Sequence, residues 1–170
     1  MVILGVDPGI ATVGFGVIRA DGNEIVPVRY GVITTPAGMR LAERLSHIYD
    51  DMCSLIDTFR PDVISIEELF FNTNITTGIS VAHGRGVILL AAEKNNVPMY
   101  EYTPLQVKQA ITGYGRAEKK QMMEMVRRLL NLNSVPKPDD AADALALAIC
   151  HTRFANSLIN FGGSDICSTI

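Results

Sequence analysis

The chain opens with an apolar run that ends abruptly in a carboxylate and a turn. The segment VILGV at 2–6 leads directly into Asp7-Pro8-Gly9. This pattern predicts a buried strand at 2–7 and a tight turn, in which Pro presets φ and Gly accepts positive φ. Asp7 would lie at the rim of the core, either as a solvated turn residue or as part of a site.

The next segments predict a small sheet and a helix that covers it. Strands are expected at 13–19 and 25–33, and their short connections are typical of an antiparallel meander. Glycines alternate within 13–19, which suits a strand that another element approaches closely. Apolar residues recur every three or four positions over 41–59, so an amphipathic helix is expected to end before Pro61.

A second β-branched run, expected as a strand at 62–68, also ends in acid, at Glu67 and Glu68. A helix joins it to the earlier strands, and such βαβ units favour parallel strands whose carboxyl ends share one side of the sheet. If the two strands are neighbours, Asp7 and Glu67 are neighbours too. Because side chains alternate along a strand, Glu67 and Glu68 point to opposite faces, and only one can meet Asp7.

The segment 76–95 is apolar on most faces and rich in small residues, which is typical of a central helix or a subunit interface. The remaining elements are one strand and three helices, expected at 97–102, from Pro104 to 112, at 117–132 and from Asp139 onward. Residues 157–170 are expected to form a loosely held tail. The chain then consists of one domain, 1–156, and that tail.

Two further acids stand three residues apart at the start of the last expected helix. Asp140 and Asp143 therefore project from one face of that helix. Acid in a first turn has an ordinary role, because it satisfies free N–H groups, and this could account for Asp139 and Asp140. Asp143 lies beyond the first turn in an Ala/Leu run, so it either faces solvent alone or points into a site.

Composition indicates one globular domain. A chain of 170 residues with 48% hydrophobic and 19% charged residues can bury a core without disulfides. No apolar run reaches membrane-spanning length and no basic leader precedes the first strand, so a cytoplasmic location and no membrane partner are expected. The three cysteines are odd in number and far apart, which suggests neither a disulfide framework nor a zinc site.

The charge distribution matters more than the net charge of −3, which by itself argues against a nucleic-acid partner. Residues 108–128 contain six basic and only two acidic residues. Such a segment favours contacts with phosphate, although a solvated charged helix face has the same appearance.

Four ordered motifs resemble those of the RuvC-type Holliday junction resolvases. They are GVDPG at 5–9, ISIEELF at 64–70, VKQAITGYGRAEK at 107–119 and DAADALALAI at 140–149. The resemblance extends from residue 1 to about 155. It implies an α/β, ribonuclease H-like fold: a five-stranded mixed sheet of three antiparallel and then two parallel strands, with helices on both faces. The elements expected from the residues alone agree with this fold.

The resemblance implies that Asp7, Glu67, Asp140 and Asp143 are catalytic and bind metal. Two Mg²⁺ ions per site are expected, with Mn²⁺ a substitute, because oxygen ligands select hard ions and two ions can assist phosphodiester hydrolysis. Without metal, four clustered carboxylates would repel one another, and at least one would hold a proton.

The same resemblance assigns DNA contacts to Lys108 and Lys119. Arg116 and Lys120 are added as phosphate contacts because they belong to the same basic segment. Phe70 matches an aromatic that the family uses at the junction core, where it would stack on or wedge beside strained bases. A core phenylalanine at the end of a strand is the alternative interpretation.

The expected function is a structure-selective endonuclease that resolves four-way DNA junctions in homologous recombination and repair. It would cut two strands of like polarity and leave 5′-phosphate and 3′-hydroxyl nicks that can be ligated. A symmetric homodimer through 76–95 would supply two sites for a nearly two-fold substrate. The resemblance also implies the RuvA–RuvB branch-migration complex as a partner.

Three other functions remain open. Another ribonuclease H-like nuclease, for instance one acting on RNA precursors, would share the acids without preferring four-way junctions. An ATPase of the actin and sugar-kinase type also opens with a strand and an Asp-x-Gly turn, but needs a second domain for which 170 residues leave no room. The third is a non-catalytic junction-binding module. The tail lacks the basic extension common in the family, which puts its contribution to DNA binding in doubt.

Overall fold

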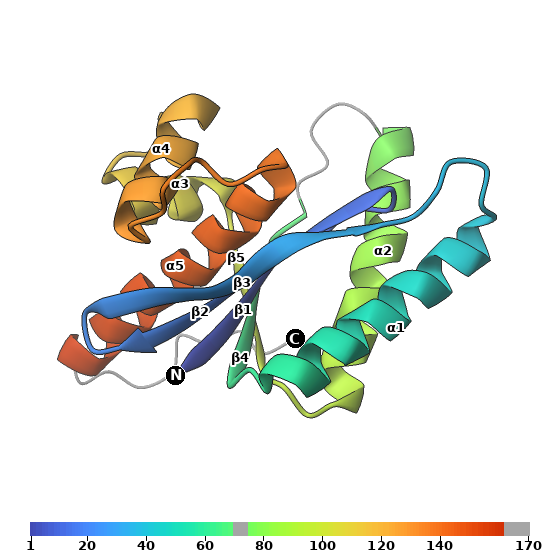
Figure 1. Ribbon diagram of the computed structural model, residues 1–170, viewed down its shortest axis with the longest axis horizontal. Coiled ribbons are helices and arrows are strands. Elements are labelled where there is room, and N and C mark those ends of the chain that lie inside the picture. The colour runs from blue at the N-terminus through green and yellow to red at the C-terminus, as the bar shows by residue number, and fades with distance from the viewer. Residues whose placement is uncertain (70–74, 162–170) are drawn as a thin grey trace.

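The computed structural model describes residues 1–69 and 75–161, except for the side chains of 75–77 and 156–161. Its centre is a five-stranded mixed sheet (Figure 1). The strands are β1 (Val2–Asp7), β2 (Thr12–Asp21), β3 (Glu24–Thr34), β4 (Val63–Glu67) and β5 (Met99–Tyr102). They lie in the order β3-β2-β1-β4-β5, with the β3-β2-β1 pairs antiparallel and the β1-β4-β5 pairs parallel. The expected α/β fold and its mixed sheet are confirmed.

Helices cover both faces of the sheet, as Figure 1 shows. On one side lie α1 (Leu41–Phe59) and α2 (Ile75–Lys94). On the other side α5 (Asp139–Phe161) crosses the sheet, with α3 (Pro104–Thr112) and α4 (Lys119–Leu129) beside it. A hydrophobic core lies on each face of the sheet, and β4 contributes to both because its side chains alternate. Ile64 and Ile66 pack toward α1 and α2, whereas Val63 packs toward α5.

The expected elements are all present, and the differences in their bounds have local causes. The strand expected at 97–102 begins at Met99, because the N–H of Val97 still bonds to the carbonyl of Ala92 in α2. The helix expected at 117–132 begins at Lys119, because Glu118 and Gln121 form a capping box at its start. The last helix enters the expected tail and continues to Phe161, and the rest of that tail lies outside the described residues.

The helix α5 lies unusually close to the sheet. A Cβ added at Gly5 of β1 or at Gly14 of β2 would collide with the backbone carbonyl of Ala144 or Asp140. This confirms the close approach predicted from the glycines of β2. The hydroxyl of Ser65 in β4 also donates a hydrogen bond of 2.7 Å to the carbonyl of Leu147. These contacts fix the start of α5 above the ends of β1 and β4.

A buried hydrogen bond between Tyr102 of β5 and His151 of α5 also links these two elements. The hydroxyl of Tyr102 and Nδ1 of His151 are hydrogen-bonded at 2.8 Å in a buried environment. Burial lowers the pKa of His151 to about 4, so this bond joins neutral groups at neutral pH. In residues 1–69 and 75–161, no helix combines the length and apolar character that crossing a membrane requires.

Candidate functional site

Two acids meet at the carboxyl ends of neighbouring parallel strands. Asp7 ends β1 and Glu67 ends β4, and the register pairs Val6 with Ile66 just before them. Both acids follow residues that point toward α1 and α2, so by alternation both side chains face α5. Glu68 lies on the other side, where its charge acts on Arg85 of α2. The adjacency of Asp7 and Glu67 and the opposite direction of Glu68 agree with the sequence-based expectation.

The first turns of α5 bring Asp140 and Asp143 to the same place. The strongest sign of this is the pKa of Asp7, which burial, Asp143, Glu67 and Asp140 together raise from 3.8 to about 8. Burial and then the charge of Asp143 also raise the pKa of Glu67. Burial therefore raises the pKa values of Asp7, Glu67 and Asp143 together, and Asp140 lies close enough for its charge to act on Asp7 and Asp143.

Lys119, near the start of α4, supplies the nearest positive charge. Its ammonium donates a 3.0 Å hydrogen bond to Asp143 and lies 3.5 Å from a carboxylate oxygen of Asp139. Burial raises the pKa of Asp143, and the hydrogen bond from Lys119 partly opposes that rise. Asp139, which the sequence interpretation treated as a helix-start acid, thus also belongs to this charge cluster. Its position beside Asp140 was the only signal for it.

Three of the four acids, Asp7, Glu67 and Asp143, line a cavity of about 280 Å³ between the carboxyl ends of the strands and α3 and α4, whereas Asp140 is not among its lining residues. Its lining residues are Asp7, Glu67, Pro104, Val107, Lys108, Lys119, Met122, Asp143, Ala146 and Leu147. Lys108 of α3 and Lys119 of α4 therefore stand at the same cavity as the carboxylates. The apolar part of the wall lowers the local dielectric, so charges in the cavity interact more strongly than in water.

The other predicted DNA-contacting residues lie elsewhere. Lys120 lines a neighbouring hollow of about 550 Å³, which it shares with Lys119, Arg128 and Asp139. Arg116 is exposed and is not among the residues that line either hollow. Phe70 falls outside the described residues.

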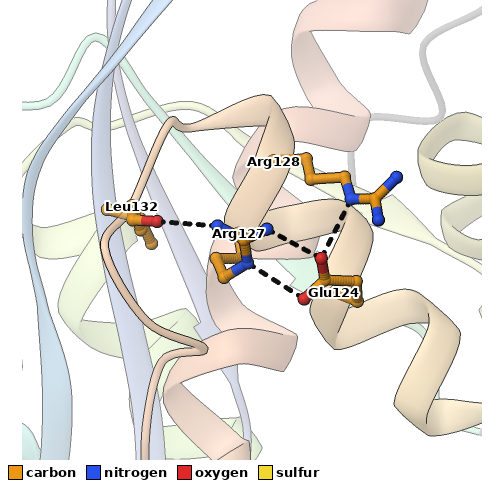
Figure 2. Close-up of polar contacts among 4 residues, drawn as sticks. All are labelled: Glu124, Arg127, Arg128 and Leu132. Carbon is orange, nitrogen blue, oxygen red and sulfur yellow. Dashed lines mark hydrogen bonds and ion pairs between the residues drawn. The ribbon is translucent and has the colours of Figure 1, made fainter.

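Two residues of the basic segment, Arg127 and Arg128, form hydrogen bonds within α4 and at its end, as Figure 2 shows. Arg127 donates to both carboxylate oxygens of Glu124, at 2.8 and 2.9 Å, and to the carbonyl of Leu132. Arg128 donates to the same carboxylate at 2.9 Å. These hydrogen bonds lower the pKa of Glu124 to about 2. Arg127 is thus occupied in closing the end of α4, a role that the charge count could not separate from DNA binding.

The donor set fits hard divalent cations, because buried carboxylates with raised pKa values lack positive charge and offer oxygen ligands. Nevertheless, across the part of the chain that the structure describes, no three acidic, histidine or cysteine side chains converge closely enough to form a ready-made metal site. In this structure Asp143 and Asp139 are instead paired with the ammonium of Lys119.

Comparisons with known proteins agree on one family. A family model described as crossover junction endodeoxyribonuclease RuvC matches residues 3–151. A protein of that description from Brevibacillus brevis is 59% identical over 154 residues, which cover 91% of this chain and 93% of the relative. One from Ruminiclostridium cellulolyticum is 56% identical over 151 residues, covering 89% and 91%.

Among solved structures, that of Thermus thermophilus RuvC in complex with a Holliday junction substrate superposes with a TM-score of 0.88. Sequence identity to it is 35%, and the match covers 92% of this chain and 96% of that one.

Proposed function

Because this chain belongs to the RuvC family of crossover junction endodeoxyribonucleases, we propose that it resolves four-way DNA junctions by metal-dependent hydrolysis. It cuts two strands of like polarity and leaves nicks with 5′-phosphate and 3′-hydroxyl ends. The observation that carries the metal-dependent part is that Asp7 and Glu67 end neighbouring strands at one cavity that Asp143 also lines, where burial and the nearby carboxylates raise the pKa of Asp7 to about 8. Such a cluster is costly to maintain unless cations bind to it.

Asp7, Glu67, Asp140 and Asp143 would hold Mg²⁺. When bound, divalent ions supply a nucleophilic water and relieve charge on the phosphate oxygens. The side chains of this cavity have complementary tasks. The carboxylates exclude anions other than a metal-bound phosphate, and Lys108 and Lys119 at the same cavity attract the DNA backbone.

In this proposal Lys119 has one role in the free protein and another in the complex with DNA. Its side chain is 56% exposed, so the hydrogen bond to Asp143 is accessible to solvent and easily exchanged. In the free protein Lys119 provides positive charge to the carboxylates, and in the complex it contacts phosphate. Lys120 and Arg116 extend the positively charged surface beyond the cavity.

The proposed homodimer forms through the outer face of α2. Ile79, His83, Gly86 and Leu90 are exposed there, at spacings of four, three and four residues that are typical of packed helix pairs. A Cβ added at Gly86 would meet no neighbouring atom, so a second helix can approach closely at this point. Two-fold symmetry would then present two sites to a junction that is itself nearly two-fold symmetric. The RuvA–RuvB complex is the proposed cellular partner.

The test compares a labelled four-way junction, plain duplex and RNA–DNA hybrid, each with and without Mg²⁺. The protein is expected to cut the junction in two strands of like polarity only with Mg²⁺, and Asp7→Asn is expected to bind the junction without cutting it. Equal cutting of duplex or hybrid would reject resolution of junctions in favour of another ribonuclease H-like nuclease. Junction cutting without divalent ions would reject the metal-dependent mechanism.

A further inference from the structure

An ion pair lies on the face of the sheet opposite the cavity, directly behind the acid-bearing strand ends. Arg85, in the middle of α2, pairs with Glu101 of β5, and their side chains are only 14% and 22% exposed. Glu101 is in register with Ile66, the residue before Glu67. The two residues therefore reach from the helix to the strand that runs beside the one carrying Glu67.

The same guanidinium is close enough to Glu68 to sense its charge. Burial lowers the pKa of Arg85, and the carboxylate of Glu68 opposes this change. Glu68 directly follows Glu67, and its N–H bonds to the carbonyl of Tyr102 in β5 at 2.9 Å. The guanidinium of Arg85 therefore lies near Glu68, the first residue after the end of β4.

This pair is a poor source of stability. Nε of Arg85 is buried without a hydrogen-bond partner in the residues that the structure describes. The cost of removing two charges from water largely offsets their attraction, so an apolar pair of similar size would pack at least as well. A role other than stability is therefore the better explanation for ionic groups at this position.

Gly84, the residue before Arg85 in α2, packs against the turn that follows β1, the strand that carries Asp7. A Cβ added at Gly84 would collide with the carbonyl oxygen of Gly9, in the turn that follows Asp7. Gly84 and Arg85 are consecutive. One short segment of α2 therefore rests against the turn after Asp7 and against the strand end that carries Glu67.

We propose that Arg85 is a positioning residue for junction cleavage, which sets the carboxylate of Glu67 relative to Asp7 by holding Glu101 and Glu68 toward α2. This inference rests on the proposed function. Arg85 lies on the α2 face of the sheet and does not line the cavity, so it would act on the reacting phosphate only through Glu67. The outer face of the same helix is the proposed dimer contact, so pairing of two protomers and placement of the acids share one element.

The test removes both charges together, with Arg85→Met and Glu101→Gln in one protein, so that no lone charge is left buried. The matched control is Arg60→Met with Asp57→Asn, which neutralises an exposed ion pair of 3.6 Å at the carboxyl end of α1. For each protein, kcat and KM for junction cutting, junction binding in EDTA, Mg²⁺ binding by calorimetry, Tm and mass in solution are measured.

The expected result for the Arg85 double variant is a kcat at least tenfold below wild type and weaker Mg²⁺ binding, with KM, junction binding and dimer mass unchanged. The control should retain the wild-type kcat and Mg²⁺ binding. A kcat and Mg²⁺ affinity within twofold of wild type in the double variant would overturn the inference while leaving junction resolution intact. If the wild-type protein itself does not prefer junctions, the proposed function fails instead.

A second variant keeps the inference testable if the double variant does not fold. Gly84→Ala forces α2 and the Gly9 turn apart while favouring the helix. It is expected to lower kcat and Mg²⁺ affinity with junction binding unchanged. Wild-type kcat and Mg²⁺ affinity in a folded Gly84→Ala protein would equally overturn the positioning role of this segment.

Discussion

At Asp7, burial and three neighbouring carboxylates act in the same direction, because each disfavours the charged form of the carboxyl group. The folded protein therefore keeps a proton on Asp7 up to about pH 8, whereas the unfolded chain releases it near 3.8. Between these values the folded state binds the extra proton, so this residue makes stability fall as pH rises. Bound divalent cations would remove that penalty by stabilising the ionised form.

Asp7→Asn should accordingly stabilise the protein in EDTA at pH 8 while abolishing cleavage. We expect the free energy of unfolding to rise by up to about 5 kcal/mol at pH 8, since each unit of pKa shift is worth about 1.4 kcal/mol, and the gain to shrink toward pH 4. Urea denaturation of wild type and variant at several pH values measures the difference. Asp50→Asn, at an exposed residue of α1 away from the cavity, is the matched control for replacing one carboxylate by an amide. A difference between Asp7→Asn and wild type that does not vary with pH would contradict the assignment of this proton.

At the scale of helices and strands, the sequence predicts those features that depend on nearby residues or on a single connection between strands. The bounds 41–59 followed from apolar periodicity and Pro61, and the adjacency of Asp7 and Glu67 followed from the handedness and parallel pairing of a βαβ unit. The ion pairs of Lys119 and Arg85 could not be predicted in this way. Each joins side chains distant in sequence, and the packing of α2, α4 and α5 on the sheet decides which residues meet.

The contact between α5 and β1 gives a prediction about that packing. In Gly5→Ala the added Cβ would collide with the carbonyl of Ala144, next to Asp143, so α5 must move away from the sheet. We expect a loss of about 1–3 kcal/mol in the free energy of unfolding and slower junction cutting. The control is Gly31→Ala, whose Cβ would meet only the movable ring of Phe15 at 3.1 Å. Equal unfolding free energies for the two variants would contradict the tight seating of α5.

At the scale of the whole molecule, the proposed function requires a chain of net charge −3 to bring two acidic sites to a polyanion. Positive charge lies directly beside the acids: Lys108 and Lys119 line the same cavity as Asp7, Glu67 and Asp143, and Lys120 lines the neighbouring hollow. A single protomer offers one such site. The proposed paired incision would therefore depend on how two protomers are held together, and the exposed stripe of α2 is the proposed contact.

Leu90→Glu places a charge in that stripe, on a side chain that is 48% exposed and so contributes little to the fold of one protomer. In a dimer the two charges would face each other and lose water, so we expect dissociation to monomers with a nearly unchanged Tm. A supercoiled plasmid with an extruded cruciform reports the consequence. The first nick releases the supercoiling and the cruciform is reabsorbed, so wild type should give linear product by two cuts within one encounter, whereas the variant should give nicked circles.

Sedimentation equilibrium measures the mass of each protein directly. Val28→Glu is the matched control, because it adds the same charge at a side chain that is 42% exposed on the edge strand β3. It should remain a dimer and linearise the plasmid as wild type does. If Leu90→Glu also stays dimeric and still yields linear product, the two protomers must meet through a surface other than this face of α2.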